Sequence, residues 1–160
     1  TSPGRPPLMF RAHRGMDPAG PRNYRLLADL LASRLGAESQ STEKAIEAGQ
    51  TWGRRLTAGE PAPQAANDDE QLIDRLIGML DDLGFSPQRR TSSGQDQIGL
   101  QHCPFLDLVP QHTDVICPVH LGLMQGAMAA MNAGITVERL EPFAEPDLCL
   151  AHLAPSTATS

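Results

Sequence analysis

The sequence has few aromatic residues, few thiols and no long apolar run. Aromatic side chains make up 4% of the 160 residues, so the core must be built mainly from aliphatic side chains. Neither an apolar run of about 18 residues nor a signal peptide is present, which predicts a soluble, cytoplasmic protein. The three cysteines are an odd number, which argues against a disulfide framework.

Basic residues are also scarce. Lys44 is the single lysine, and the formal net charge is -6. Nucleic-acid binding depends on clustered Lys and Arg side chains that neutralise phosphates. We therefore expect no direct DNA contact from this chain. Because it begins with Thr1, and residues 4–10 have the pattern of a strand-like tail, we expect it to be a fragment of a longer protein.

The first half of the chain has the periodicity of helices. Asp17 and Pro18 predict the start of a helix that ends near Gly36. The apolar residues at helical spacing within it are Tyr24, Leu26, Leu27, Leu30, Leu31 and Leu35. A second helix is predicted from Ser41 or Thr42 to the Gly- and Pro-rich break at 59–63, and a third from the cap and acids at 67–70 to Gly84.

The period changes after Gly84. Phe85 to Thr91 and Gln97 to His102 predict a β-hairpin around a glycine turn. A short helix from Phe105 to Val109 and a longer one from Pro118 to Asn132 follow. The last predicted elements are two strands, Ile135 to Leu140 and Leu148 to Leu153.

These elements predict an α+β fold, in which N-terminal helices precede a small antiparallel sheet with the order strand, strand, helix, strand, strand. We divide the chain into a helical linker or dimerisation segment at 1–66, a metal-binding sensory domain at 67–154 and a disordered tail at 155–160.

All candidate soft metal ligands lie in the last third of the chain. Cys103, Cys117, His120 and Cys149 together supply one tetrahedral ligand set for zinc. Three cysteines can also anchor a four-iron, four-sulfur (4Fe–4S) cluster. Because Cys103 and Cys117 each precede a proline, both are predicted to be helix N-caps with thiols of low pKa.

His120 follows Cys117 by three residues, so both side chains should project from one helix face. By strand alternation, His152 should point away from the face of Cys149, and His102 away from that of Cys103. We interpret these two histidines as structural or supporting residues.

Three alternatives compete with a metal site. The cysteines could be buried free thiols that act as small apolar residues. A catalytic Cys117–His120 pair is the second, but neighbours on a helix rarely gain the third, orienting group, so we predict no enzyme. In the third alternative, the face of Met124, Met128 and Met131 lines a small-molecule pocket, and zinc is only structural. Packing into the core is the simpler interpretation of this stripe. The Gly122 and Gly126 pair predicts close packing against the sheet or a partner.

Three segments carry a resemblance to a known family. They are Leu100-Gln-His-Cys-Pro-Phe105, Val115-Ile-Cys-Pro-Val-His-Leu-Gly122, and Leu140-Glu-Pro-Phe143 leading to Asp147-Leu-Cys149. Together with 4–10 and 20–27, they resemble the part of actinobacterial winged helix-turn-helix regulators of the ArsR-like class that follows the DNA-binding head.

In the related SufR-type repressors, a Cys-Pro-Phe-like corner and two later cysteines hold an iron-sulfur cluster. The resemblance implies Cys103, Cys117 and Cys149 as the matching ligands; this chain differs from the pattern in offering His120 and in slightly longer spacings. It also implies a sensory and dimerisation domain, homodimeric, that contacts DNA only through an absent winged-helix domain. A small-molecule effector remains an alternative signal.

Overall fold

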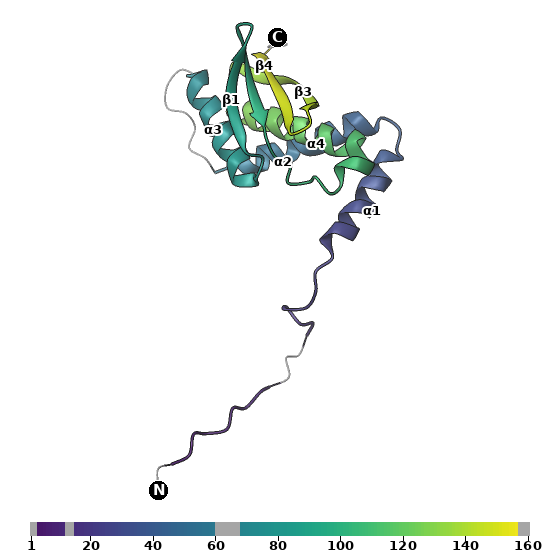
Figure 1. Cartoon of the computed structure of the whole chain (residues 1–160), viewed down its shortest axis with the longest axis vertical. Coiled ribbons are helices and arrows are strands. Elements are labelled where there is room, and N and C mark those ends of the chain that lie inside the picture. The colour runs from purple at the N-terminus through teal and green to yellow at the C-terminus, as the bar shows by residue number, and fades with distance from the viewer. Residues whose placement is uncertain (1–2, 12–14, 60–67, 157–160) are drawn as a thin grey trace.

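The computed structural model describes residues 3–11, 15–59 and 68–156. The described elements, in chain order, are helices α1 (Tyr24–Gly36), α2 (Ser41–Thr57) and α3 (Asp69–Leu83), strands β1 (Pro87–Ser92) and β2 (Gln95–Leu100), helix α4 (Val109–Ala130), and strands β3 (Ile135–Glu145) and β4 (Leu148–Pro155). The predicted α+β class is confirmed (Figure 1).

The four strands form one antiparallel sheet in the order β1-β2-β4-β3. The predicted hairpin is present, and Ser93 and Gly94 form its turn with φ of 52° and 76°. In the centre of the sheet, Leu100 of β2 pairs with Cys149 of β4. Two segments far apart in sequence therefore meet beside the Cys-Pro-Phe corner.

Local capping explains where two helices begin and end. The Asn23 side chain accepts a hydrogen bond from the Leu26 N–H at 3.2 Å, and α1 starts there. The predicted start at Asp17 and Pro18 is wrong, because Asp17 closes a separate turn: its side chain accepts from the Ala19 N–H at 2.9 Å. Asp68 caps α3, and Gly84 ends it with φ of 97°. The cap residue Asn67 lies outside the described residues.

The structure has α4, with a kink at His112, in place of the two helices predicted for 105–132. Residues 104–108 form turns, and α4 runs through Pro118 with its irregularity at His112, where φ is -135° and ψ is 33°. Pro118 was predicted to start a helix because proline suits the first turn, but tertiary packing of α4 outweighs the loss of one backbone donor. Cys117 consequently lies inside a helix and is not an N-cap.

The main core lies between the sheet and helices α3 and α4. Its fully buried members include Leu72, Leu76, Ile98, Leu123, Met124, Met128, Val137 and Ala151. The methionine stripe of α4 is therefore core, as its spacing predicts, and only Met131 also borders a cavity. Within the described residues, no helix is long and apolar enough to cross a membrane.

Helices α2 and α4 approach each other through glycines. A Cβ added to Gly49 or Gly53 of α2 would collide with the backbone of α4, and one added to Gly122 or Gly126 would collide with the backbone of α2. The close packing predicted for the α4 glycine pair is confirmed, and its partner is α2. The proposed boundary near residue 66 lies among residues the structure does not describe, and α2 packs across it onto α4.

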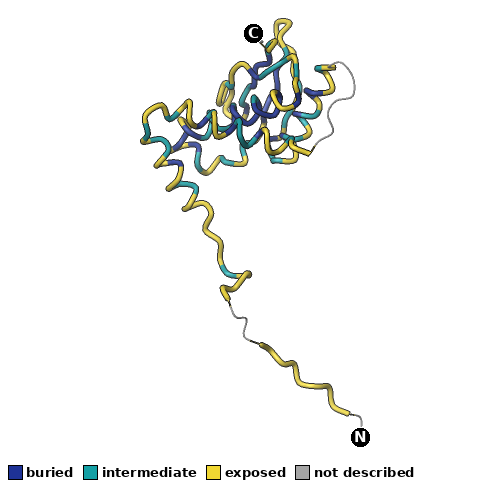
Figure 2. Tube along the Cα trace, turned by 180° about the vertical axis from the view of Figure 1, so that it is seen from behind, coloured by how far each residue is buried: buried dark blue, intermediate teal, exposed yellow. Residues whose placement is uncertain are grey.

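Helix α1 projects away from the rest of the protein, and its C-terminal part lies closest to it (Figures 1 and 2). Ala32 is its one buried residue, and the His112 Nε2 lies 2.6 Å from the Asp29 Oδ1, which ties α1 to the irregular turn of α4. Five large apolar side chains of α1 are more than half exposed: Tyr24, Leu26, Leu27, Leu30 and Leu31. A helix that is apolar on both sides is usually covered on both.

Candidate metal centre

The four predicted ligands line one pocket. Cys103 enters from the loop after β2, Cys117 and His120 from α4, and Cys149 from β4. The sequence separations give no local reason for this meeting; the pairing of β2 with β4 and the packing of α4 under the sheet produce it. His120 and Cys117 do share one face of the helix, as their spacing predicts.

Most of the other side chains that wall this pocket are apolar. They are Phe85, Leu100, Val109, Ile116, Leu140 and Phe143. The free volume is about 20 Å³, which is room for about one water or one ion. Low polarity of the wall strengthens every electrostatic interaction between the donors and a cation held there.

Burial changes the ionisation of the thiols. Desolvation raises the pKa of Cys103 and raises that of Cys117 to about 11, and repulsion from the neighbouring thiolates adds to both effects. The predicted low pKa values are therefore wrong for these two cysteines. Cys117 is not at a helix N-terminus that could lower its pKa, because helical residues of α4 precede it.

Two backbone N–H groups point at the sulfurs. The Phe143 N–H donates to the Cys149 Sγ at 3.3 Å, from a residue held at φ of 50°. The Phe105 N–H donates to the Cys103 thiol and partly opposes its raised pKa. Hydrogen bonds of this kind stabilise sulfur that carries negative charge, as metal-bound thiolate does.

His120 is buried without a polar partner at one ring atom. Its Nε2 is the buried side-chain polar atom that lacks a hydrogen bond in the described part of the chain, and the ring stacks on Phe85 with centroids 3.9 Å apart. Burial lowers the pKa of His120 to about 3, so the imidazole is neutral at pH 7. A neutral, unpartnered imidazole nitrogen is a competent metal ligand.

The two histidines predicted to be structural or supporting residues, His102 and His152, differ in position. His152 is buried outside this pocket, with its Nδ1 3.3 Å from the Gln97 Nε2 and its Nε2 3.1 Å from the Glu141 Oε2. The prediction that it points away from Cys149 is confirmed. His102 borders the pocket but is exposed, and its N–H bonds to the Phe85 carbonyl. Sequence patterns gave no signal for the role of Phe85 as the stacking partner of His120.

The four donor residues line one pocket but do not form a coordination site as they stand. In the arrangement described, no three His, Cys, Asp or Glu side chains among the described residues form a group that could hold a metal ion. Binding of one ion therefore requires the thiols to rotate inward. Three thiols and an unpartnered buried imidazole nitrogen are nevertheless the donor chemistry that soft metals select.

The burial of His120 has a consequence for acid stability. Between about pH 6.5 and the folded-state pKa of about 3, the unfolded chain binds a proton at this residue and the folded chain does not. The free energy of unfolding of the metal-free protein should therefore fall by about 1 kcal/mol per pH unit as pH drops below 6.5. Urea titrations of wild type and His120→Phe test this. We expect a shallower slope in the variant, and equal slopes would contradict the assignment.

Comparison with known proteins identifies no family. No protein-family model matches the chain, and no curated protein is significantly similar to it.

Proposed function

We propose that this chain is the metal-binding regulatory domain of a transcriptional regulator, attached to a DNA-binding winged-helix head that this sequence does not contain. One observation carries the metal site: Cys103, Cys117, His120 and Cys149 converge on a single apolar pocket from three separate elements. The regulatory role is supported by the resemblance of the Cys-Pro-Phe and Cys-Pro-Val-His segments to regulators of the ArsR-like class.

Zinc is the occupant that this donor set suits best. Three thiolates and one imidazole complete a tetrahedral site without an outside ligand. The Nε2 of His120 has no hydrogen-bond partner and would be the fourth zinc ligand. The small free volume of the pocket accommodates one ion rather than a larger group. When bound, zinc would tie β4 and the corner after β2 to α4. The free energy of zinc binding would then add to the free energy of unfolding.

An iron-sulfur cluster is the second candidate, and a specific observation favours it. The N–H groups of Phe105 and Phe143 donate to the sulfurs of Cys103 and Cys149, a feature that tunes cluster potentials. Among the described residues the donors also do not form a group that could hold one ion as they stand, and a cluster joins more widely spaced ligands than one ion does. Cluster binding would require the apolar wall around His120 to open.

The geometry gives no support to a catalytic cysteine. A nucleophilic thiol requires a lowered pKa and a base within hydrogen-bond distance. The pKa of Cys117 is instead raised to about 11, and the His120 Nε2 has no hydrogen-bond partner in the described chain. We therefore propose a non-enzymatic role.

The metal-loading test compares two buried histidines. We expect about one zinc per chain in the wild-type protein, and at least a tenfold loss of zinc affinity in His120→Gln. The matched control is His152→Gln, which removes a buried histidine that lies outside the pocket. Elemental analysis after dialysis against a chelator measures the zinc that wild type and each variant retain. Equal loading of the two variants would show that His120 is not a ligand.

A second copy of this chain is the partner we propose for α1. The exposed stripe of Tyr24, Leu26, Leu27, Leu30 and Leu31 faces away from the side of α1 that Ala32 and Asp29 attach to α4. Pairing two copies of α1 through this stripe would cover ten large apolar side chains, five from each chain. The contact between Asp29 and His112 would then join the dimer contact to the helix that carries Cys117 and His120.

Sedimentation of wild type and a Leu27→Ser, Leu30→Ser double variant tests the dimer. Because both side chains are exposed in the monomer, the substitutions should leave its fold intact while weakening association by about tenfold or more. The control is Leu106→Ser, an exposed leucine of the loop before α4. A wild-type protein that is monomeric at all concentrations would contradict this proposal.

A further inference from the structure

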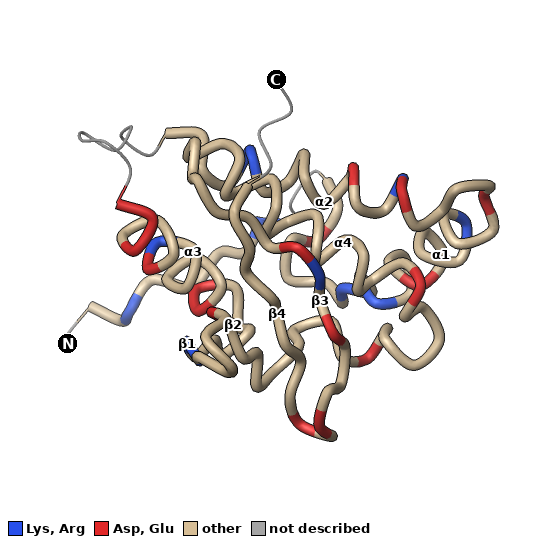
Figure 3. The backbone as a smooth tube through the Cα atoms, turned by 90° about the horizontal axis from the view of Figure 1, so that it is seen from above, with Lys and Arg blue, Asp and Glu red and all other residues tan. Residues whose placement is uncertain are grey.

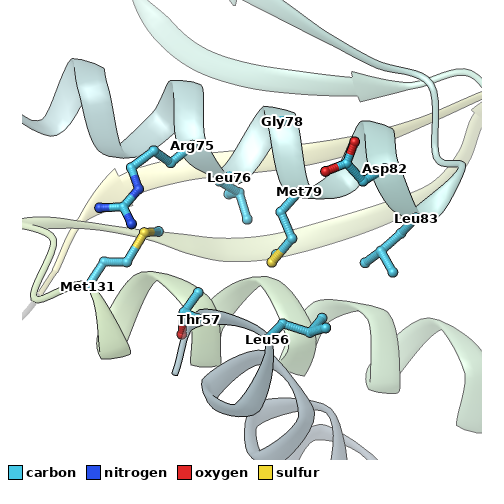
Figure 4. A pocket seen from close by; sticks show the side chains of 9 residues that line it. All are labelled: Leu56, Thr57, Arg75, Leu76, Gly78, Met79, Asp82, Leu83 and Met131. Carbon is cyan, nitrogen blue, oxygen red and sulfur yellow. The ribbon is translucent and has the colours of Figure 1, made fainter. Parts of the chain in front are cut away.

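A second cavity lies between α3 and the C-terminal ends of α2 and α4 (Figure 4). It has a volume of about 380 Å³, within the range of roughly 300–1,000 Å³ typical of small-molecule sites. It shares no lining residue with the cysteine pocket. Gly78 contributes to its open side, since a Cβ there would meet no atom within 4 Å.

Apolar and adaptable side chains line most of this cavity. Leu76 forms its buried floor, while Met79 and Leu83 of α3 face Leu56 of α2 across it (Figure 4). Met131, the residue that follows α4, also lines the cavity. Methionine side chains adjust to irregular apolar surfaces, so a ligand with an apolar body of modest size can be covered here.

The charge of the cavity rim is negative at the end nearest Leu83. Asp82 lies in the last turn of α3, beside Asp81, and no basic residue occupies that turn. The helix dipole is negative at a C-terminus, so carboxylates there destabilise the helix and a cation would relieve the cost. Within the described chain, the Asp82 carboxylate has no hydrogen bond or ion pair, whereas Arg75 at the opposite end of the cavity already takes part in an interaction.

The wider field around α3 has the same sign (Figure 3). The helix and its cap carry Asp68, Asp69, Glu70, Asp74, Asp81 and Asp82 against Arg75 of the helix and Arg89 of β1, which pairs with Glu70. Such a field concentrates cations and repels anions. An apolar cavity with an unpartnered carboxylate at its rim therefore matches an amphiphilic cation and not a fatty acid.

We propose that this cavity binds small organic cations. The ammonium group lies against Asp82 and the C-terminal end of α3, and the apolar body lies on Met79 and Leu83. This site is independent of the metal centre and does not rest on the proposed regulatory function. It adds a binding activity for an amine ligand with an apolar body of about ten carbon atoms.

The test uses two probes with the same apolar body and opposite charge, 4-phenylbutylamine and 4-phenylbutanoate. Each is titrated into isotopically labelled wild-type protein at low ionic strength and followed by amide chemical shifts. We expect the amine to bind about fivefold or more tightly than the carboxylate, with shifts centred on 78–83 and on Leu56. In Asp82→Asn this preference should disappear.

The matched control is Asp74→Asn, an exposed acid of the same helix that does not line the cavity. It should bind the amine as wild type does. Three results with the wild-type protein would overturn the proposal: no saturable shifts for the amine, equal affinities for the two probes, or shifts centred on the cysteine pocket. A loss of preference in Asp74→Asn as large as that in Asp82→Asn would reduce the effect to general charge and would also overturn it.

Discussion

Gly126→Ala should unfold or severely destabilise this protein, by about 3 kcal/mol or more. A Cβ at this position would overlap the backbone carbonyl of Gln50, and the glycines of α2 face α4 equally closely. Neither backbone can move away cheaply, because α4 is held on its other side by the sheet and α3. Urea denaturation followed by circular dichroism gives the change in the free energy of unfolding.

The control for this prediction is Gly78→Ala. Gly78 lies inside α3, is exposed, and has no atom within 4 Å of the position that a Cβ would take. There the substitution should stabilise the protein by about 0.5–1 kcal/mol, because alanine is the better helix former. Opposite signs at the two glycines are expected. A mild effect of Gly126→Ala would show that α2 and α4 are not packed at this distance.

Zinc binding at pH 7 should release at least two protons per ion. Metal ligation requires thiolates, while burial raises the pKa of Cys103 and raises that of Cys117 to about 11, so both thiols enter the reaction protonated. His120 contributes no proton, because its pKa is lowered to about 3. Zinc affinity should therefore rise with pH by about a hundredfold per unit near neutrality, about tenfold for each displaced proton.

Calorimetric titrations in two buffers with different ionisation enthalpies count the released protons. Replacing Cys103 by serine should lower the count by one, and His120→Gln should leave it unchanged. Release of fewer than one proton in wild type would mean that the thiols are already ionised, and would contradict the assigned effect of burial.

The sequence was sufficient to predict the class of fold and four candidate ligands that line one pocket. Short runs separated by turn residues located all four strands, and glycines marked the first hairpin and the end of α3. The four ligand positions were identified by residue type, and the fold brings all of them to one pocket. Whether that pocket binds metal stays a prediction.

Other features depend on tertiary contacts that no local pattern encodes. Proline after Cys117 indicated a helix start, but packing against α2 and the sheet carries α4 through Pro118. The same error led to the expectation of a lowered pKa for Cys117. Because this thiol is not at a helix N-terminus, burial raises its pKa instead. Spacing predicted close contact for Gly122 and Gly126, whereas only the fold shows that α2 provides the opposing surface.

The central claim is that this domain holds a soft metal at its cysteine pocket. The most direct measurement is anaerobic purification followed by an absorption spectrum and by zinc, iron and sulfide analysis of one sample. We predict a colourless protein with about one zinc per chain; brown absorbance with about four irons and sulfide would instead identify the cluster. Protein that contains neither metal, and binds neither when supplied under reducing conditions, would contradict the claim.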